Sequence, residues 1–178
     1  MEKQVTTLTP FERLSLMNQF SMLKAVDPEN ESHYDDQIEI LRSGYTIMYG
    51  EVFKYVYEEM EEDECRYVFD VLDMHRILIN SFEALKDKQG LTADDVVFEG
   101  FDGNNETKRY AFAEYLRKAG RWKETLVGDL NSHSIMTMHR YPKMLERYEP
   151  IKKQILDSHM GKWQLTAEQI KTVIGKEG

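Results

Sequence analysis

One uninterrupted stretch, Glu62 to Lys88, most constrains the fold, because it runs for its whole length without Pro or Gly. At about 100° per residue, its apolar side chains fall within one arc of roughly 160°. These are Cys65, Tyr67, Val68, Val71, Leu72, Met74, Leu78, Ile79, Phe82 and Leu85. Polar residues fill the opposite side, so the stretch predicts an amphipathic helix about 40 Å long, over about 63–87. We expect an all-α, multihelical single domain built around it.

The bulk composition is that of a globular chain. With 178 residues, 41% hydrophobic and 31% charged, the chain is long enough to bury a core without a disulfide or a metal. We find no internal repeat and no low-complexity linker. We therefore expect a flexible leader over 1–8, one helical domain over 9–175 and a tail over 176–178.

Charge and cysteine content exclude several classes of function. A net charge of -9 argues against a general nucleic-acid binder, which needs Lys and Arg to displace phosphate counterions. The single cysteine, Cys65, excludes an intrachain disulfide and a CxxC metal site, and we expect it to be buried as a small hydrophobe. There is neither a secretory signal nor an apolar run of membrane-spanning length, so we expect a cytoplasmic protein without a membrane partner.

The first predicted helix has an unusual surface. Thr9, Pro10 and Glu12 form a capping box and helix start, and Asp27 precedes the proline that ends the helix after Val26. Its apolar residues are spread widely around the axis. Such a helix is contacted on several sides, either inside the domain or by another chain.

Further helices are predicted downstream. Turn residues and apolar spacing place them at about 32–43, 48–56, 106–119, 142–157 and 166–174, with one capped turn near 91–96. Pro142 is taken as the start of the fourth of these, kinked or restarted at Pro150, because proline disrupts a helix interior. Thr166 and Gln169 form the capping box of the last helix.

Two polar loops are the places where a site is expected, near 99–106 and 128–134. In the first loop, Asp102, Asn104 and Glu106 resemble the start of a calcium loop. That motif needs Gly and Glu where this chain has Thr107 and Ala113, so a turn followed by a helix cap is favoured over a cation site.

The second loop carries His133, beside Asp129, Asn131, Ser132 and Ser134. Either Asn131 and Ser132 cap the next turn and His133 lies on the surface, or His133 is a ligand or an acid–base residue. If the two loops meet, they form one polar pocket with Tyr110 and Trp122 at its edge, where Arg109 could hold a carboxylate or phosphate. The candidate pocket residues are Asp102, Asn104, Glu106, Arg109, Asn131, Ser132 and His133.

The other histidines are interpreted as structural. His75 falls on the apolar arc of the long stretch, where a histidine usually donates to a backbone carbonyl; His33, His139 and His159 show no ligand pattern. The chain has no phosphate-binding glycine motif, zinc-protease motif, nucleophile elbow or di-iron Glu-x-x-His. No metal site and no cofactor are predicted.

Three segments resemble the YfbU-like family of uncharacterised bacterial proteins: LTPFERLSLMNQF, FEGFDGNNETKRYAFAEYL and DLNSHSIMTMHRYPKMLERYE. The resemblance covers about Leu8 to Ile174 and implies a helical, cytoplasmic, self-associating protein with no assigned reaction. Pro142 departs from the pattern, inside a segment that looks like a continuous helix elsewhere in the family. The loop positions that match the family pattern are Gly100, Phe101, Asp102, Asn104, Glu106, Asn131, Ser132 and His133.

Together these features predict a self-associating interaction or regulatory module without catalytic activity. Its partners would be a second copy of itself and, as a further option, another protein. The alternative is a small-molecule-binding protein or a hydrolase using the polar pocket, with His133 as acid or base and Asp102 or Glu106 assisting.

Overall fold

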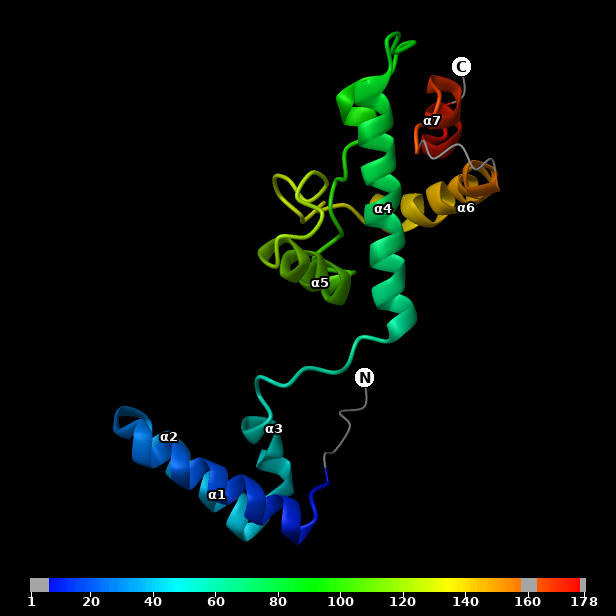
Figure 1. The fold of residues 1–178 in the computed structure, drawn as a ribbon. Helices are drawn as coiled ribbons and strands as arrows, with labels where there is room; N and C mark the ends of the chain where they lie inside the picture. Colours follow the sequence, from blue (N-terminus) through cyan, green and yellow to red (C-terminus); the bar gives the residue numbers. More distant parts are fainter. Residues whose placement is uncertain (1–6, 158–162, 177–178) are drawn as a thin grey trace. The chain divides into compact units, whose positions relative to one another are not determined.

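A computed structural model describes residues 7–157 and 163–176 (Figure 1). Most of the predicted leader, residues 1–6, and the last two residues of the predicted tail lie outside the described part, as does His159. Within the described residues the regular structure is helical, and the one β-type pairing is an isolated bridge between Phe101 and Asn131. The predicted all-α class is confirmed.

Seven α-helices and three short 3-10 helices follow one another along the described chain. The α-helices are α1 (Pro10–Val26), α2 (Glu31–Ser43), α3 (Tyr49–Val52), α4 (Glu62–Ala84), α5 (Thr107–Lys118), α6 (Ile135–Asp157) and α7 (Ala167–Ile174). The 3-10 helices are η1 (Pro28–Asn30), η2 (Thr46–Met48) and η3 (Ala93–Asp95).

Contacts between residues divide the chain into two compact units, 1–59 and 60–178. Each has its own cluster of buried side chains. The extent of the predicted single domain, 9–175, stays a prediction, and the two units are described separately.

In the N-terminal unit, α1 and α2 lie side by side (Figure 1). The predicted capping box is present: Thr9 Oγ1 accepts from the Glu12 N–H at 3.2 Å, and the Glu12 carboxylate accepts from the Thr9 N–H at 2.8 Å. The buried cluster of this unit is small, consisting of Ile40, Leu41 and Tyr49 with partly buried neighbours. No residue of α1 is buried.

The C-terminal unit is organised around α4, as the sequence predicts, and α5, α6 and α7 pack against it (Figure 1). The apolar arc of α4 supplies fully buried side chains to one continuous core. They include Val68, Val71, Leu72, Met74 and Leu78.

The long helix ends a few residues before its predicted boundary near residue 87. α4 ends at Ala84, because Leu85 is extended and the chain turns back. The Lys88 ammonium then donates to the carbonyls of Phe82 and Glu83 at this helix end, where the Phe82 carbonyl also accepts from the Leu85 N–H at 3.2 Å. Cys65 is half-buried rather than buried, with Sγ 3.7 Å from the Met60 carbonyl oxygen.

Two other helix predictions are also corrected. The short helix predicted over 48–56 stops at Val52. Pro142 does not begin a helix, because α6 starts at Ile135 and continues through both Pro142 and Pro150. Both prolines are exposed, so the backbone carbonyls that lose their helical donors can be solvated instead.

Candidate functional site

The structure brings the two polar loops into direct contact. The Phe101 N–H donates to the Leu130 carbonyl at 3.0 Å, and the Ser132 N–H donates to the Phe101 carbonyl at 3.1 Å. These bonds make the isolated parallel bridge between the loops. Segments thirty residues apart in sequence therefore form one junction, which lies beside the start of α5 and just before α6.

Gly100 makes this close approach possible. Its φ of +94° lies in the region that only glycine enters at little cost. A Cβ at this position would lie 2.2 Å from the Leu130 carbonyl oxygen, which is a severe clash with backbone.

Asn131 joins the two loops through one atom. Its Oδ1 accepts from the Gly103 N–H at 3.0 Å and from the His133 N–H at 3.1 Å. The Asn131 N–H in turn donates to the Asp129 carboxylate at 2.9 Å. The asparagine therefore fixes the backbone of both predicted loops at once.

The two carboxylates predicted for the pocket, those of Asp102 and Glu106, are buried and accept hydrogen bonds from within the first loop. Asp102 Oδ1 accepts from the Asn104 N–H at 3.0 Å, and its Oδ2 accepts from the Asn105 side-chain amide at 2.5 Å. These hydrogen bonds, the Asn105 side chain first, hold the pKa of Asp102 below its usual range. Glu106 Oε2 accepts from the Asp102 N–H at 3.2 Å. This geometry matches the predicted turn of the first loop, whereas the N-cap residue of α5, Glu106, makes no side-chain capping bond to that helix.

Arg109 is also engaged, between two carboxylates. Its Nη1 donates to Glu106 Oε1 at 2.8 Å, and its Nε lies 3.4 Å from Glu64 Oε1. The guanidinium carbon lies 4.4 Å from the centre of the Tyr67 ring. Burial raises the pKa of Tyr67 to about 12, so this phenol stays neutral. An anionic ligand would have to compete with both carboxylates for Arg109.

His133 lies at the surface of the junction. Its side chain is 67% exposed, and its backbone has a φ of +49°. The nearest paired carboxylate is Asp129, with Oδ2 3.6 Å from His133 Nε2. The catalytic alternative named Asp102 or Glu106 as the assisting group, whereas the structure pairs the imidazole with Asp129.

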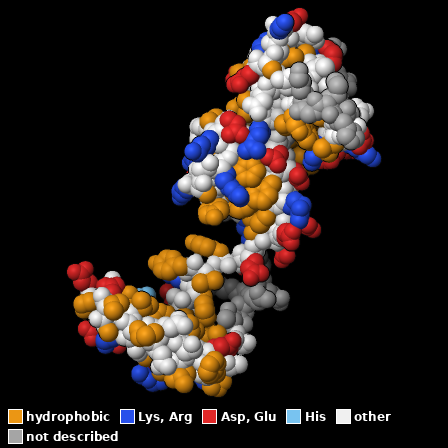
Figure 2. Space-filling view, viewed as in Figure 1, with side chains coloured by type: hydrophobic (Ala, Val, Ile, Leu, Met, Phe, Trp, Pro, Cys, Tyr) orange, Lys and Arg blue, Asp and Glu red, His pale blue; other side chains and the backbone are white. Residues whose placement is uncertain are grey.

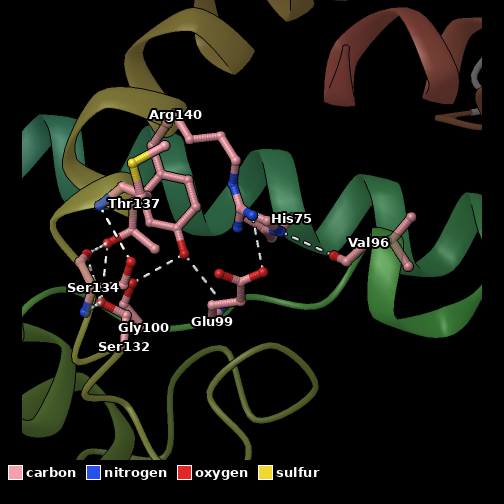
Figure 3. Close-up of polar contacts among 10 residues, drawn as sticks. His75, Val96, Glu99, Gly100, Ser132, Ser134, Thr137 and Arg140 are labelled. Carbon is pink, nitrogen blue, oxygen red and sulfur yellow. Dashed lines mark hydrogen bonds and ion pairs between the residues drawn. The ribbon is translucent and has the colours of Figure 1, made fainter. Parts of the chain in front are cut away.

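The remaining predicted residues divide between the junction and other places. Asn104 is exposed on the first loop. Ser132 Oγ lies 3.0 Å from Thr137 Oγ1, at the start of α6 (Figure 3). Trp122 instead stacks on Phe69, with ring centres 5.1 Å apart, and donates from Nε1 to the Asp73 carboxylate at 2.7 Å.

A residue that sequence reasoning missed, Tyr141, holds the junction from α6. Its hydroxyl donates to the Gly100 carbonyl at 3.0 Å and accepts from the Glu99 N–H at 3.2 Å. Next to it, Arg140 Nη1 lies 2.9 Å from Glu99 Oε1 (Figure 3). Burial raises the pKa of Tyr141 far above its usual range. The signal that could have found Tyr141 is the helical spacing of the residues of α6. Placing a helix start at Pro142 concealed that spacing.

His75 is a core histidine, as predicted. It is 1% exposed, and its Nδ1 lies 2.9 Å from the Val96 carbonyl oxygen (Figure 3). A carbonyl only accepts, so Nδ1 carries the proton and Nε2 is the buried lone pair. The rings of Phe98 and Tyr141 meet the imidazole edge to face. Burial lowers the pKa of His75 to about 4, so the ring is neutral at pH 7.

Neither a metal cluster nor a spanning helix is seen in the described part of the chain. No three side chains of His, Cys, Asp or Glu are grouped there so that they could hold a metal ion. Among the same residues, no helix combines the length and apolar character needed to cross a bilayer.

Comparison with known proteins assigns the family. The sequence model of the YfbU domain matches residues 6–175. The chain belongs to the YfbU family. A relative in this family is UPF0304 protein MJECS11 of Methanocaldococcus jannaschii, which is 35% identical over 151 residues, covering 80% of this chain and 88% of the relative. The family is uncharacterised, so it transfers no catalytic residue to this YfbU chain.

The geometry indicates what the loop junction does. Its buried carboxylates, its asparagine and its phenol bond to the backbone of the two loops. Within this YfbU chain the junction therefore fixes loop conformation and joins α5 to α6. The predicted ligand pocket over these residues stays a prediction.

Proposed function

We propose that this chain is a self-associating interaction module without chemistry of its own, and that two copies pair through the outer face of α1. The observation that carries the proposal is the exposure of large apolar side chains on this helix. Phe11 and Val26 are each 78% exposed, Met22 is 63% exposed and Leu14 is 54% exposed.

These side chains form a stripe rather than a scatter. Phe11, Leu14, Met22 and Val26, with Asn18 between them, are separated by three or four residues and so share one side of the helix. We call this set the α1 stripe. Figure 2 shows many hydrophobic side chains on the visible surface of the N-terminal unit.

The charged residues of α1 are bound elsewhere. Glu12 closes the capping box, Arg13 Nη1 donates to the Leu41 carbonyl at 3.2 Å, and Lys24 Nζ lies 2.7 Å from Asp35 Oδ2. None of these charged residues belongs to the α1 stripe. A charge-free apolar stripe is complementary to a copy of itself, which is what a two-fold symmetric interface requires.

The small core of the unit favours the same partner. Fewer than sixty residues bury only a few apolar side chains, and a unit of this size is marginal alone. Pairing two α1–α2 hairpins would create a four-helix arrangement whose shared core covers both stripes. Another protein as partner, and the cytoplasm as compartment, remain part of the proposal, the latter testable by fractionation.

The test is the mass of the purified chain in solution, measured by light scattering after size exclusion. We expect a dimer at about 10 µM, and we expect Met22→Lys to weaken dimerisation at least a hundredfold, because it places an unpaired charge in the interface. Ile135→Lys is the matched control, since Ile135 is 52% exposed on α6. A monomeric wild-type chain, or equal effects of both variants with helicity retained, would refute the proposal.

A further inference from the structure

We propose that a cleft in the N-terminal unit binds an organic cation, an amine or guanidine with an apolar body. The cleft is lined by α2, by residues 45–55 and by Phe20 of α1, so it belongs entirely to this unit. Its volume is about 700 Å³, within the usual range of small-molecule sites. It is separate from the loop junction and involves no residue of the α1 stripe.

The charge of the lining selects a cation. The lining contains three carboxylates, those of Asp36, Glu39 and Glu51, and one ammonium, that of Lys54, which lies 5.8 Å from the centre of the Tyr55 ring. Glu39 is already bound, by Arg42 at 3.0 Å and by the Ser43 hydroxyl at 2.7 Å. The side chains of Asp36 and Glu51 make no hydrogen bond or ion pair with any described residue. Two carboxylates are therefore available to a ligand.

A buried amide in the same lining points to a ligand independently of charge. Gln37 is only 5% exposed, and its side-chain oxygen Oε1 is buried without a donor among the described residues. Buried acceptors are nearly always hydrogen-bonded in folded proteins. A bound ammonium or guanidinium carries N–H donors, so a turn of the Gln37 amide towards the cleft would let Oε1 accept from a cation that also pairs with a neighbouring carboxylate.

The remaining lining residues indicate the apolar part of the ligand. Tyr45 is 52% exposed and Tyr55 is 79% exposed, so both aromatic rings are accessible at the cleft. Aromatic faces attract cations and pack on flat apolar groups. Ile40, Met48 and Val52 add apolar surface. An anion would meet uncompensated carboxylates, so the site discriminates by charge.

The experiment is calorimetric titration of the full chain with two cations, tryptamine and agmatine. Tryptophol is the control ligand, because it replaces the ammonium of tryptamine with a hydroxyl. We expect at least one cation to bind saturably, tryptamine to bind at least tenfold tighter than tryptophol, and the Asp36→Asn/Glu51→Gln variant to weaken cation binding at least tenfold. Gln37→Leu should weaken it several-fold.

Glu83→Gln is the matched control variant, since Glu83 is an exposed carboxylate on α4, outside the N-terminal unit. It should leave binding unchanged. Absence of saturable heat with both cations at millimolar concentration would overturn the proposal. Equal binding of tryptamine and tryptophol would overturn it, and so would equal loss in the Glu83→Gln chain. If Gln37→Leu does not fold, the surface double variant still decides.

Discussion

At the scale of single residues, His75 shows how a polar side chain is accommodated on the apolar arc of α4. The imidazole packs against the rings of Phe98 and Tyr141, at a position where a hydrocarbon side chain is usual. A hydrogen bond to the Val96 carbonyl satisfies one of its nitrogens. Burial disfavours the charged form, which is why the pKa falls although the hydrogen bond to Val96 opposes the shift. The neutral ring is therefore part of the fold.

This residue predicts a pH dependence of stability. The folded pKa is about 4 and the usual value is 6.5, so the unfolded chain takes up the proton first. The His75 contribution is therefore constant above about pH 7 and is lost as pH falls from 6.5 towards 4, by about 2 kcal/mol at pH 5. Urea unfolding at pH 7 and pH 5 measures it.

His75→Asn is the control, because asparagine can keep a donor near Nδ1 without titrating. Carboxylates that titrate in both chains cancel in the comparison. We expect the variant to lose about 2 kcal/mol less than wild type between the two pH values. An equal loss in both chains would show that His75 is not the titrating group.

At the scale of elements, the two polar loops are held by one another. The sequence indicated turn chemistry in each loop separately, and the structure adds the pairing through Phe101 and Asn131. Tyr141 reaches this junction from α6, which is continuous through Pro142. A local rule about proline predicted a helix start there. Exposure of that side of α6 to water overrode the rule.

Gly100 gives the prediction at this scale. Gly100→Ala combines a φ of +94° with a Cβ placed 2.2 Å from the Leu130 carbonyl oxygen, so the loops must separate. We expect a loss of about 2–4 kcal/mol in the free energy of unfolding, measured by chemical denaturation.

Gly90→Ala separates the two causes. Gly90 has a φ of +79°, but a Cβ there would meet nothing within 4 Å. It should cost only about 1 kcal/mol, the price of the backbone conformation alone. If both variants lose the same stability, the close approach at the loop junction contributes nothing.

At the scale of the whole molecule, the division into two units has a thermodynamic consequence. The C-terminal unit has a large continuous core, whereas the N-terminal unit buries few side chains. We expect two unfolding transitions in urea, with the N-terminal unit unfolding first. The proposed dimer would stabilise the folded unit by mass action, so the midpoint of this first transition should rise with protein concentration.

Two probes distinguish the transitions. Both tryptophans of the chain, Trp122 and Trp163, lie in the C-terminal unit, so their fluorescence reports that unit alone. Far-ultraviolet circular dichroism reports helices in both units. We expect the dichroism signal to show the earlier, concentration-dependent transition, and Met22→Lys to remove the concentration dependence. Coincident transitions from both probes would contradict the division.

The sequence by itself determined the features that depend on neighbours along the chain. The apolar arc of α4, the Thr9 and Thr166 capping boxes and the core position of His75 follow from helical spacing and local hydrogen bonding, which act over a few residues. It also contained the family assignment, which rests on residues 6–175. Charge and composition limited the classes of function.

Only the tertiary structure decided which distant groups meet. It paired the two loops, turned Asp102 and Glu106 into internal acceptors, and left His133 beside Asp129 at the surface. It also grouped Asp36, Gln37 and Glu51 around one cleft that no local pattern indicates. The physical reason is that burial and electrostatic pairing depend on distances in space. Spacing along the chain determines those distances only within a single helix or turn.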